Sequence, residues 1–147
     1  MNKRKVFILF TLLSVFAFSA CSFIPLNSVP YMVDGDFVME EASEEYSVCG
    51  IDLIFFNQSD KCVKNFSIVF FLFDKDGEPA RECSNRISFD IEKTVEARDS
   101  FSKCLSLDKY MNSFPEELLW VDYLYVSRID YEDGTFWEDP YGLVAFK

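Results

Sequence analysis

The chain of 147 residues is long enough for one folded domain with little left over. Half of its residues are hydrophobic and 18% are aromatic, including 17 Phe, and this apolar content excludes an intrinsically disordered chain. The formal net charge of −11 repels phosphate backbones, so we expect no nucleic acid partner.

The first twenty residues are predicted to be a signal peptide with a helical apolar run. Lys3, Arg4 and Lys5 give a positive start, and a predominantly apolar run of thirteen residues follows from Val6 to Phe18. That run suits a signal peptide and is shorter than the roughly 20 residues that a transmembrane helix needs. Without this segment the chain carries 11 basic and 25 acidic residues, a net charge of −14.

The end of this segment resembles the lipobox of bacterial lipoproteins. Ser19 and Ala20 match the small residues before the modified cysteine, Cys21, whereas Phe18 stands where Leu is common. The resemblance implies cleavage before Cys21 and a diacylglyceryl group on its thiol. Two or three acyl chains anchor a protein stably. We therefore expect a lipoprotein on a membrane of the bacterial cell envelope, facing the periplasm or the cell surface; an ordinary secretory signal is the alternative.

Residues 21–45 are expected to tether the folded domain to its lipid. Two prolines and the acidic cluster Glu40–Glu45 are typical of a solvated spacer, with one edge strand near Phe37 to Met39. The predicted organisation is a signal peptide at 1–20, a tether at 21–45 and a β-sandwich domain at 46–147.

Short apolar runs separated by turn signals predict strands from residue 46 onward. Phe66–Phe73 is apolar on both faces, as expected for a strand in the middle of a sheet. In Ile87–Ile91 the side chains of Ile87, Phe89 and Ile91 alternate with polar ones and are expected to face inward. The other predicted strands are Ile51–Phe56, Phe101–Leu107, Leu119–Tyr131 and a last strand that runs to about Phe146.

Two connections carry more specific predictions. Pro115-Glu116-Glu117 is typical of a first helical turn, which predicts one short helix between Leu107 and Leu119. Asp133-Gly134 predicts a two-residue type I′ hairpin loop that puts Tyr131 opposite Phe136. Six or seven short strands without βαβ alternation predict an all-β, antiparallel sandwich, with a small barrel as the alternative.

A family resemblance refines this fold class. Phe70-Phe71-Leu72-Phe73-Asp74 is similar to the Phe-x-Leu-Tyr-Asp signature of FxLYD-type domains, with Phe73 in place of Tyr. The segment Ile129–Trp137 resembles the closing hairpin of related envelope lipoproteins. The resemblance covers residues 46 to 146. It implies an immunoglobulin-like β-sandwich of about seven strands and no catalytic residues.

Four cysteines follow the anchor, at positions Cys49, Cys62, Cys83 and Cys104. An even number in an exported domain predicts two disulfides, with three possible pairings. An immunoglobulin-like topology favours Cys49–Cys104 with Cys62–Cys83, although Cys104 alternates out of phase with Leu105. Free thiols are the alternative. A zinc site is disfavoured because the chain has no C-x-x-C motif and no His.

Two acidic turns, Asp74–Glu78 and Asp130–Gly134, offer oxygen ligands of the kind that calcium prefers. Neither has the spacing of an EF-hand loop, and turn geometry explains the glycine in each. We therefore predict no metal site and no cofactor.

Aromatic residues near the predicted hairpin form a candidate binding patch: Tyr131, Phe136, Trp137 and Tyr141. Cross-strand aromatic pairs also stabilise sheets without binding anything. The chain lacks His and has neither a G-x-S-x-G motif nor a phosphate loop, so we expect no enzyme. The leading hypothesis is a structural or protein-interaction module with an envelope protein partner. The alternative is a lipoprotein that binds a small ligand or carbohydrate through the aromatic patch.

Overall fold

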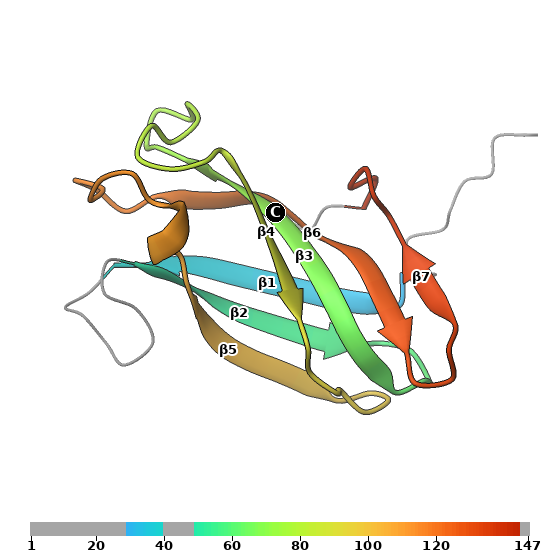
Figure 1. The fold of residues 1–147 in the computed structure, drawn as a ribbon. Helices are drawn as coiled ribbons and strands as arrows, with labels where there is room; N and C mark the ends of the chain where they lie inside the picture. The colour runs from blue at the N-terminus through green and yellow to red at the C-terminus, as the bar shows by residue number, and fades with distance from the viewer. Residues whose placement is uncertain (1–28, 40–48, 145–147) are drawn as a thin grey trace, which may run out of the picture.

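The computed structural model describes residues 29–39 and 49–144, and the seven strands in these ranges form two antiparallel sheets packed face to face (Figure 1). Sheet A has the order β1-β2-β5 and sheet B the order β4-β3-β6-β7. The strands are β1 (Tyr31–Val38), β2 (Gly50–Asn57), β3 (Val63–Phe73), β4 (Arg86–Ile91), β5 (Ser100–Ser106), β6 (Trp120–Tyr131) and β7 (Phe136–Glu138). The predicted all-β, immunoglobulin-like sandwich is confirmed, and the barrel is not formed.

The fourth strand lies on a different sheet from that of a constant-type immunoglobulin domain. In that arrangement the fourth strand lies in the sheet of the first two strands, whereas β4 pairs with β3 in sheet B. As a result β3 has a partner on both sides, β4 and β6. The prediction of a central strand at Phe66–Phe73 is confirmed.

Strand β1 lies within the segment expected to be a tether. It extends well beyond the edge strand expected near Phe37 to Met39, and it pairs with β2 along its whole length, from Tyr31 opposite Asn57 to Val38 opposite Gly50. Its residues alternate strictly between buried and exposed up to Phe37. Such period-two alternation is the signature of a strand with one face on a core. The sandwich therefore includes residues from Tyr31, ahead of the boundary set at residue 46.

The prediction of a helix between Leu107 and Leu119 is wrong. Within the described residues this stretch has only a short 3-10 helix, η2 (Asp108–Tyr110). Met111 instead forms a β-bridge with Cys83, and the Asn112 N–H donates to the carbonyl of Glu82 at 2.6 Å. The Tyr110 carbonyl also accepts from the Ser84 N–H, so the loop before β4 takes up backbone groups at residues 110 and 112 that a longer helix would need.

The hairpin after β6 has a three-residue loop instead of the predicted two. The Tyr131 N–H donates to the Thr135 carbonyl at 2.9 Å, and Asp130 pairs with Phe136. Gly134 has φ +80°, as a type I turn followed by a left-handed residue requires. A shift of one residue exchanges the faces of a strand. The observed register turns Trp137 toward the core and leaves Phe136 exposed.

The last strand is much shorter than predicted. Strand β7 ends at Glu138, and Pro140, which has no N–H to give to a ladder, follows two residues later. Phe146, the expected end of the strand, lies outside the described residues.

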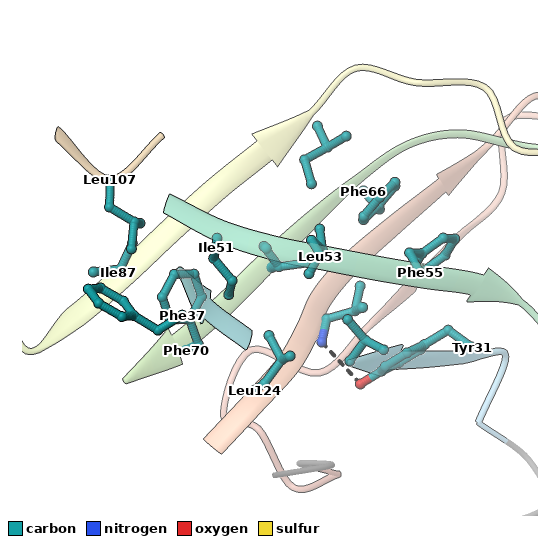
Figure 2. Close-up of a cluster of buried hydrophobic side chains, with 14 of the residues drawn as sticks. Tyr31, Phe37, Ile51, Leu53, Phe55, Phe66, Phe70, Ile87, Leu107 and Leu124 are labelled. Carbon is teal, nitrogen blue, oxygen red and sulfur yellow. Dashed lines mark hydrogen bonds between the residues drawn. The ribbon is translucent and has the colours of Figure 1, made fainter. Parts of the chain in front are cut away.

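The core fills the space between the sheets (Figure 2). The rings of Phe55 in sheet A and Phe66 in sheet B stack with centroids 4.1 Å apart. The Tyr31 hydroxyl accepts a hydrogen bond from the Val126 N–H at 3.1 Å and donates to the Val144 carbonyl at 3.2 Å. Burial raises the pKa of Tyr31 to about 12. One buried hydroxyl therefore joins β1, β6 and the end of the described chain.

Candidate functional site

An open groove of about 370 Å³ lies on the outer face of sheet B, the face turned away from sheet A. Its lining comes from β3, the residue before β4, β6 and the segment that follows β7. We call it the aromatic groove; it is lined by Phe71, Phe73, Asn85, Tyr123, Tyr125, Tyr141 and Gly142.

Strand β3 forms the floor of the aromatic groove. Phe70 and Leu72 are fully buried in the core, so the alternation of the strand puts Phe71 and Phe73 on the outer face. Both outer rings are half-buried. The apolar character of both faces of β3 therefore has two causes, core packing on one side and a groove on the other.

A β-bulge in β6 positions Tyr123. The pairing of Val69–Phe71 with Asp122–Tyr125 leaves Phe70 opposite both Tyr123 and Leu124. Leu124 is fully buried, whereas Tyr123 is 56% exposed and has φ +49°. A bulge of this kind redirects a side chain, and a non-glycine residue at positive φ is strained. The bulge thus keeps Leu124 in the core and leaves Tyr123 over the groove.

At the centre of the groove, the ring of Tyr123 contacts the rings of both Phe71 and Phe73. The Phe71 and Tyr123 centroids lie 6.0 Å apart with an interplanar angle of 79°, and the Phe73 and Tyr123 centroids lie 6.3 Å apart at 52°. Offset and edge-to-face arrangements of this kind are favourable for aromatic pairs. The cluster holds its shape through these contacts while one ring, that of Tyr123, stays largely open to solvent.

The segment after β7 forms one wall of the groove. The Asp139 N–H donates to the Ser127 carbonyl, and the Asp139 carboxylate accepts from the Val144 N–H, both at 2.9 Å. Gly142, at φ +64°, lies so close to Tyr125 that a β-carbon there would come within 2.7 Å of the ring. Only glycine allows the segment to lie directly on Tyr125 in this way.

The predicted patch near the hairpin is not brought together. Tyr131 is buried, and Trp137 is half-buried with its ring centroid 5.3 Å from that of Tyr31. Phe136 is 55% exposed, with the Arg128 guanidinium 4.5 Å from its centroid. Tyr141 is 84% exposed and is the one predicted patch residue among those that line the aromatic groove.

The structure does not form the favoured disulfide pairings. Cys49, Cys62 and Cys83 are free thiols. Cys104 pairs with the exposed Asp52 and so lies on the outer face of sheet A, whereas Cys49 is fully buried in the core. Burial raises the pKa of the Cys49 thiol to about 12. Opposite faces of one sheet cannot be joined by a disulfide, whose β-carbons must lie about 3.8 Å apart.

Cys62 and Cys83 lie toward opposite ends of sheet B. Cys62 comes just before β3, where Val63 pairs with Tyr131, and Cys83 lies beyond the other end of the ladder, where Phe71 pairs with Arg86. Desolvation raises the pKa of both thiols. The predicted lipidation site, Cys21, lies outside the described residues.

The carboxylates of the two acidic turns bond to their own turns. Asp74 accepts the N–H groups of Asp76 and Glu78 at 2.9 and 3.0 Å. Asp133 accepts the Thr135 N–H at 2.9 Å, and its hydrogen bond with the Lys61 ammonium, together with those from Thr135, lowers its pKa to about 2. No three metal-ligating side chains come together anywhere in the described ranges.

Sequence reasoning missed most of the groove. The missed lining residues are Phe71, Phe73, Asn85, Tyr123, Tyr125 and Gly142. A signal was present in the outward positions of two predicted strands, where Phe71 and Phe73, and Tyr123 and Tyr125, sit two residues apart. Four aromatic residues at outward positions exceed what a solvated face needs.

Compared with family models, with curated proteins and with solved structures, the chain matches none. The similarity to FxLYD-type domains stays a prediction. Within residues 29–39 and 49–144, no helix has the length and apolar character that crossing a membrane would require.

Proposed function

We propose that the chain is a bacterial envelope lipoprotein, anchored by lipid on Cys21, whose β-sandwich binds a ligand in the aromatic groove. The observation that carries the binding role is the groove itself, where the ring of Tyr123 contacts those of Phe71 and Phe73. Concave sites with aromatic linings and a few polar groups are the usual form of small-ligand sites. The lipobox pattern at Ser19, Ala20 and Cys21 supports the anchor.

The position of the groove agrees with such an anchor. Strand β1 begins ten residues after Cys21, at the end of the sandwich where Tyr31 pairs with Asn57. Phe73 is the last residue of β3 and Asn85 precedes β4, so the groove extends toward the opposite end. A domain tethered through β1 therefore presents the Phe73 and Asn85 part of the groove away from its attachment point, whereas Tyr141 on the groove wall also lines a smaller hollow with Val29, two residues before β1.

A protein partner is the second candidate, and a different surface favours it. Phe114, Leu118 and Trp120, on the connection between β5 and β6 and at the start of β6, are 70%, 59% and 65% exposed. Exposed apolar side chains that gather in one place are typical of protein contact surfaces. The three residues lie within a run of seven residues, and none of them lines the aromatic groove.

Photocrosslinking in the native envelope tests the two candidates against each other. A photoreactive phenylalanine derivative replaces Tyr123 in the groove, Phe114 on the exposed connection or, as a control, Ser102 on the outer face of sheet A. We expect adducts from position 123 well above those from position 102. Adducts from position 114 alone would favour the protein partner and contradict the groove. Equal, background yields at all three positions would contradict both candidates.

A further inference from the structure

The aromatic groove has an uncharged lining in a strongly charged protein. None of the seven described residues that line it carries a charge, although charged residues make up 27% of the chain. Arg86 and Asp122, which flank Phe71 in register, border the groove with opposite charges. A second hollow of about 290 Å³ differs in kind, because Lys75, Arg81 and several acidic residues line it. The lining itself therefore supplies no counter-ion to a charged ligand, and the two charges at its border are of opposite sign.

The net charge of the protein also bears on the charge of a ligand that the groove could accept. The chain after the predicted cleavage site has a net charge of −14, which disfavours the approach of anions. A cation would be drawn to the acidic surface but would find no carboxylate among the groove lining. The lining and the overall charge together favour a neutral ligand.

The rings and the polar groups of the lining narrow the ligand class. Tyr123 and Tyr141 are 56% and 84% exposed, so both present ring surface to solvent. Asn85 adds an amide that can donate and accept, and the tyrosine hydroxyls can do the same. A ligand that matches this lining has flat apolar faces for the rings and neutral hydroxyl groups for the polar atoms.

We infer that the aromatic groove binds a neutral carbohydrate chain. A sugar ring has an apolar face of C–H groups and a rim of uncharged hydroxyls, which match the rings and the Asn85 and tyrosine groups of the lining. The open shape of the groove admits a segment of a longer chain. This inference rests on the proposed function, because it names the ligand class of the same groove.

Binding of defined oligosaccharides to the full-length lipoprotein, purified in detergent, tests the inference. The probes are cellohexaose, maltohexaose, chitohexaose and xylohexaose as neutral chains and hexagalacturonate as a charged one, measured by isothermal titration calorimetry. We expect at least one neutral chain to bind with a Kd below about 1 mM, and hexagalacturonate to bind at least about tenfold more weakly, a difference of about 1.4 kcal/mol.

Two variants connect any binding to the groove. Tyr123→Asn removes the ring while keeping a residue that tolerates positive φ, and Tyr141→Ala removes a ring that is 84% exposed and makes little contribution to folding. We expect each to weaken binding about tenfold or more. Phe136→Ala, which removes an exposed ring near β7 outside the groove lining, should leave the Kd unchanged.

The results separate a wrong ligand class from a wrong site. The inference is overturned if no neutral chain binds, if hexagalacturonate binds more tightly than every neutral chain, or if Phe136→Ala weakens binding as much as the groove variants. Crosslinked adducts from position 123 without sugar binding would retain the groove as a binding site and reject carbohydrate. Background adducts from position 123 together with no sugar binding would reject both.

Discussion

Tyr31 is a single residue on which three segments of the described chain depend. Its hydroxyl accepts from the Val126 N–H on β6 and donates to the Val144 carbonyl, and its ring packs against Trp137. The N–H of Val126 lies in a buried strand, where no water can replace the hydroxyl. An unsatisfied buried donor is more costly than the loss of an exposed hydrogen bond.

Replacing Tyr31 with Phe should therefore destabilise the domain by about 1–3 kcal/mol, because it leaves the Val126 N–H without this acceptor. Urea unfolding followed by circular dichroism measures the change. Tyr110→Phe is the matched control, since that hydroxyl donates to the Ser88 carbonyl at an exposed site, and it should cost clearly less. Equal stability of Tyr31→Phe and the wild type would show that the hydroxyl does not connect these segments.

The wild type and Tyr31→Phe should also differ in how their stability changes in alkaline solution. Tyr31 has a pKa of about 12 in the folded protein against an ordinary value of 10.0. Between these values the folded state keeps a proton that the unfolded chain has lost, so stability falls as the pH rises from 10 to 12. Tyr31→Phe should lose stability less steeply over this interval than the wild type does.

The register of the hairpin between β6 and β7 depends on the conformation and contacts of its loop. Gly134 at φ +80° follows a type I turn, and the Asp133 carboxylate bonds to Thr135 and to Lys61 on the connection before β3. The loop thus receives contacts from a neighbouring strand connection as well as from its own residues. These contacts and the burial of Trp137 account for a register that differs from the predicted one.

Gly134→Val should destabilise the domain by about 1–3 kcal/mol, because a β-branched residue at positive φ is strained. The loss of stability follows from the positive φ of Gly134 alone. It is expected for the three-residue loop as it would be for a two-residue one. Thermal unfolding provides the measurement. Gly134→Asn is the control and should cost less, since Asn tolerates this region. A Val variant that melts with the wild type would contradict the turn geometry.

The elements that could be predicted from the sequence are those whose signal is local. Period-two alternation identified Ile87–Ile91, and a continuous apolar run identified Phe66–Phe73, because one face of each strand lies on the core. The stretch from Leu107 to Leu119 was misjudged because its backbone bonds to residues 82–84, a contact that no local pattern encodes.

The site was less predictable than the fold for a related reason. Tyr123 reaches the groove through a bulge opposite Phe70, and Gly142 forms the wall because the chain folds back onto Tyr125. Both features depend on how distant segments meet. The aromatic residues near the hairpin predicted a patch that included Phe136 and Trp137, but these two are neighbours on one strand and therefore point to opposite faces.

The charge of the whole molecule makes the lipid the expected means of attachment. With a net charge of −14 the chain after residue 20 has no electrostatic affinity for anionic lipid. Cys21→Ala should abolish incorporation of labelled palmitate, whereas Ser22→Ala, which keeps the thiol, should not. A version that begins at Ser22 behind a conventional cleavable signal should appear in the soluble fraction. Salt-resistant pelleting of that version with membranes would contradict an anchor formed by lipid alone.

The attachment of β1 along the whole of β2 also determines how the protein would respond to mechanical load. If the lipid holds Cys21 and a ligand is held in the groove, tension enters β1 at Tyr31, while the resisting force acts on sheet B toward the opposite end. The component of this pull along the axis of β1 is parallel to the strand and runs across the direction of its hydrogen bonds with β2. Such shear loads the bonds of the ladder together, whereas a pull from the side would open them one at a time. That component of the load would therefore act on the strand in its mechanically stronger direction.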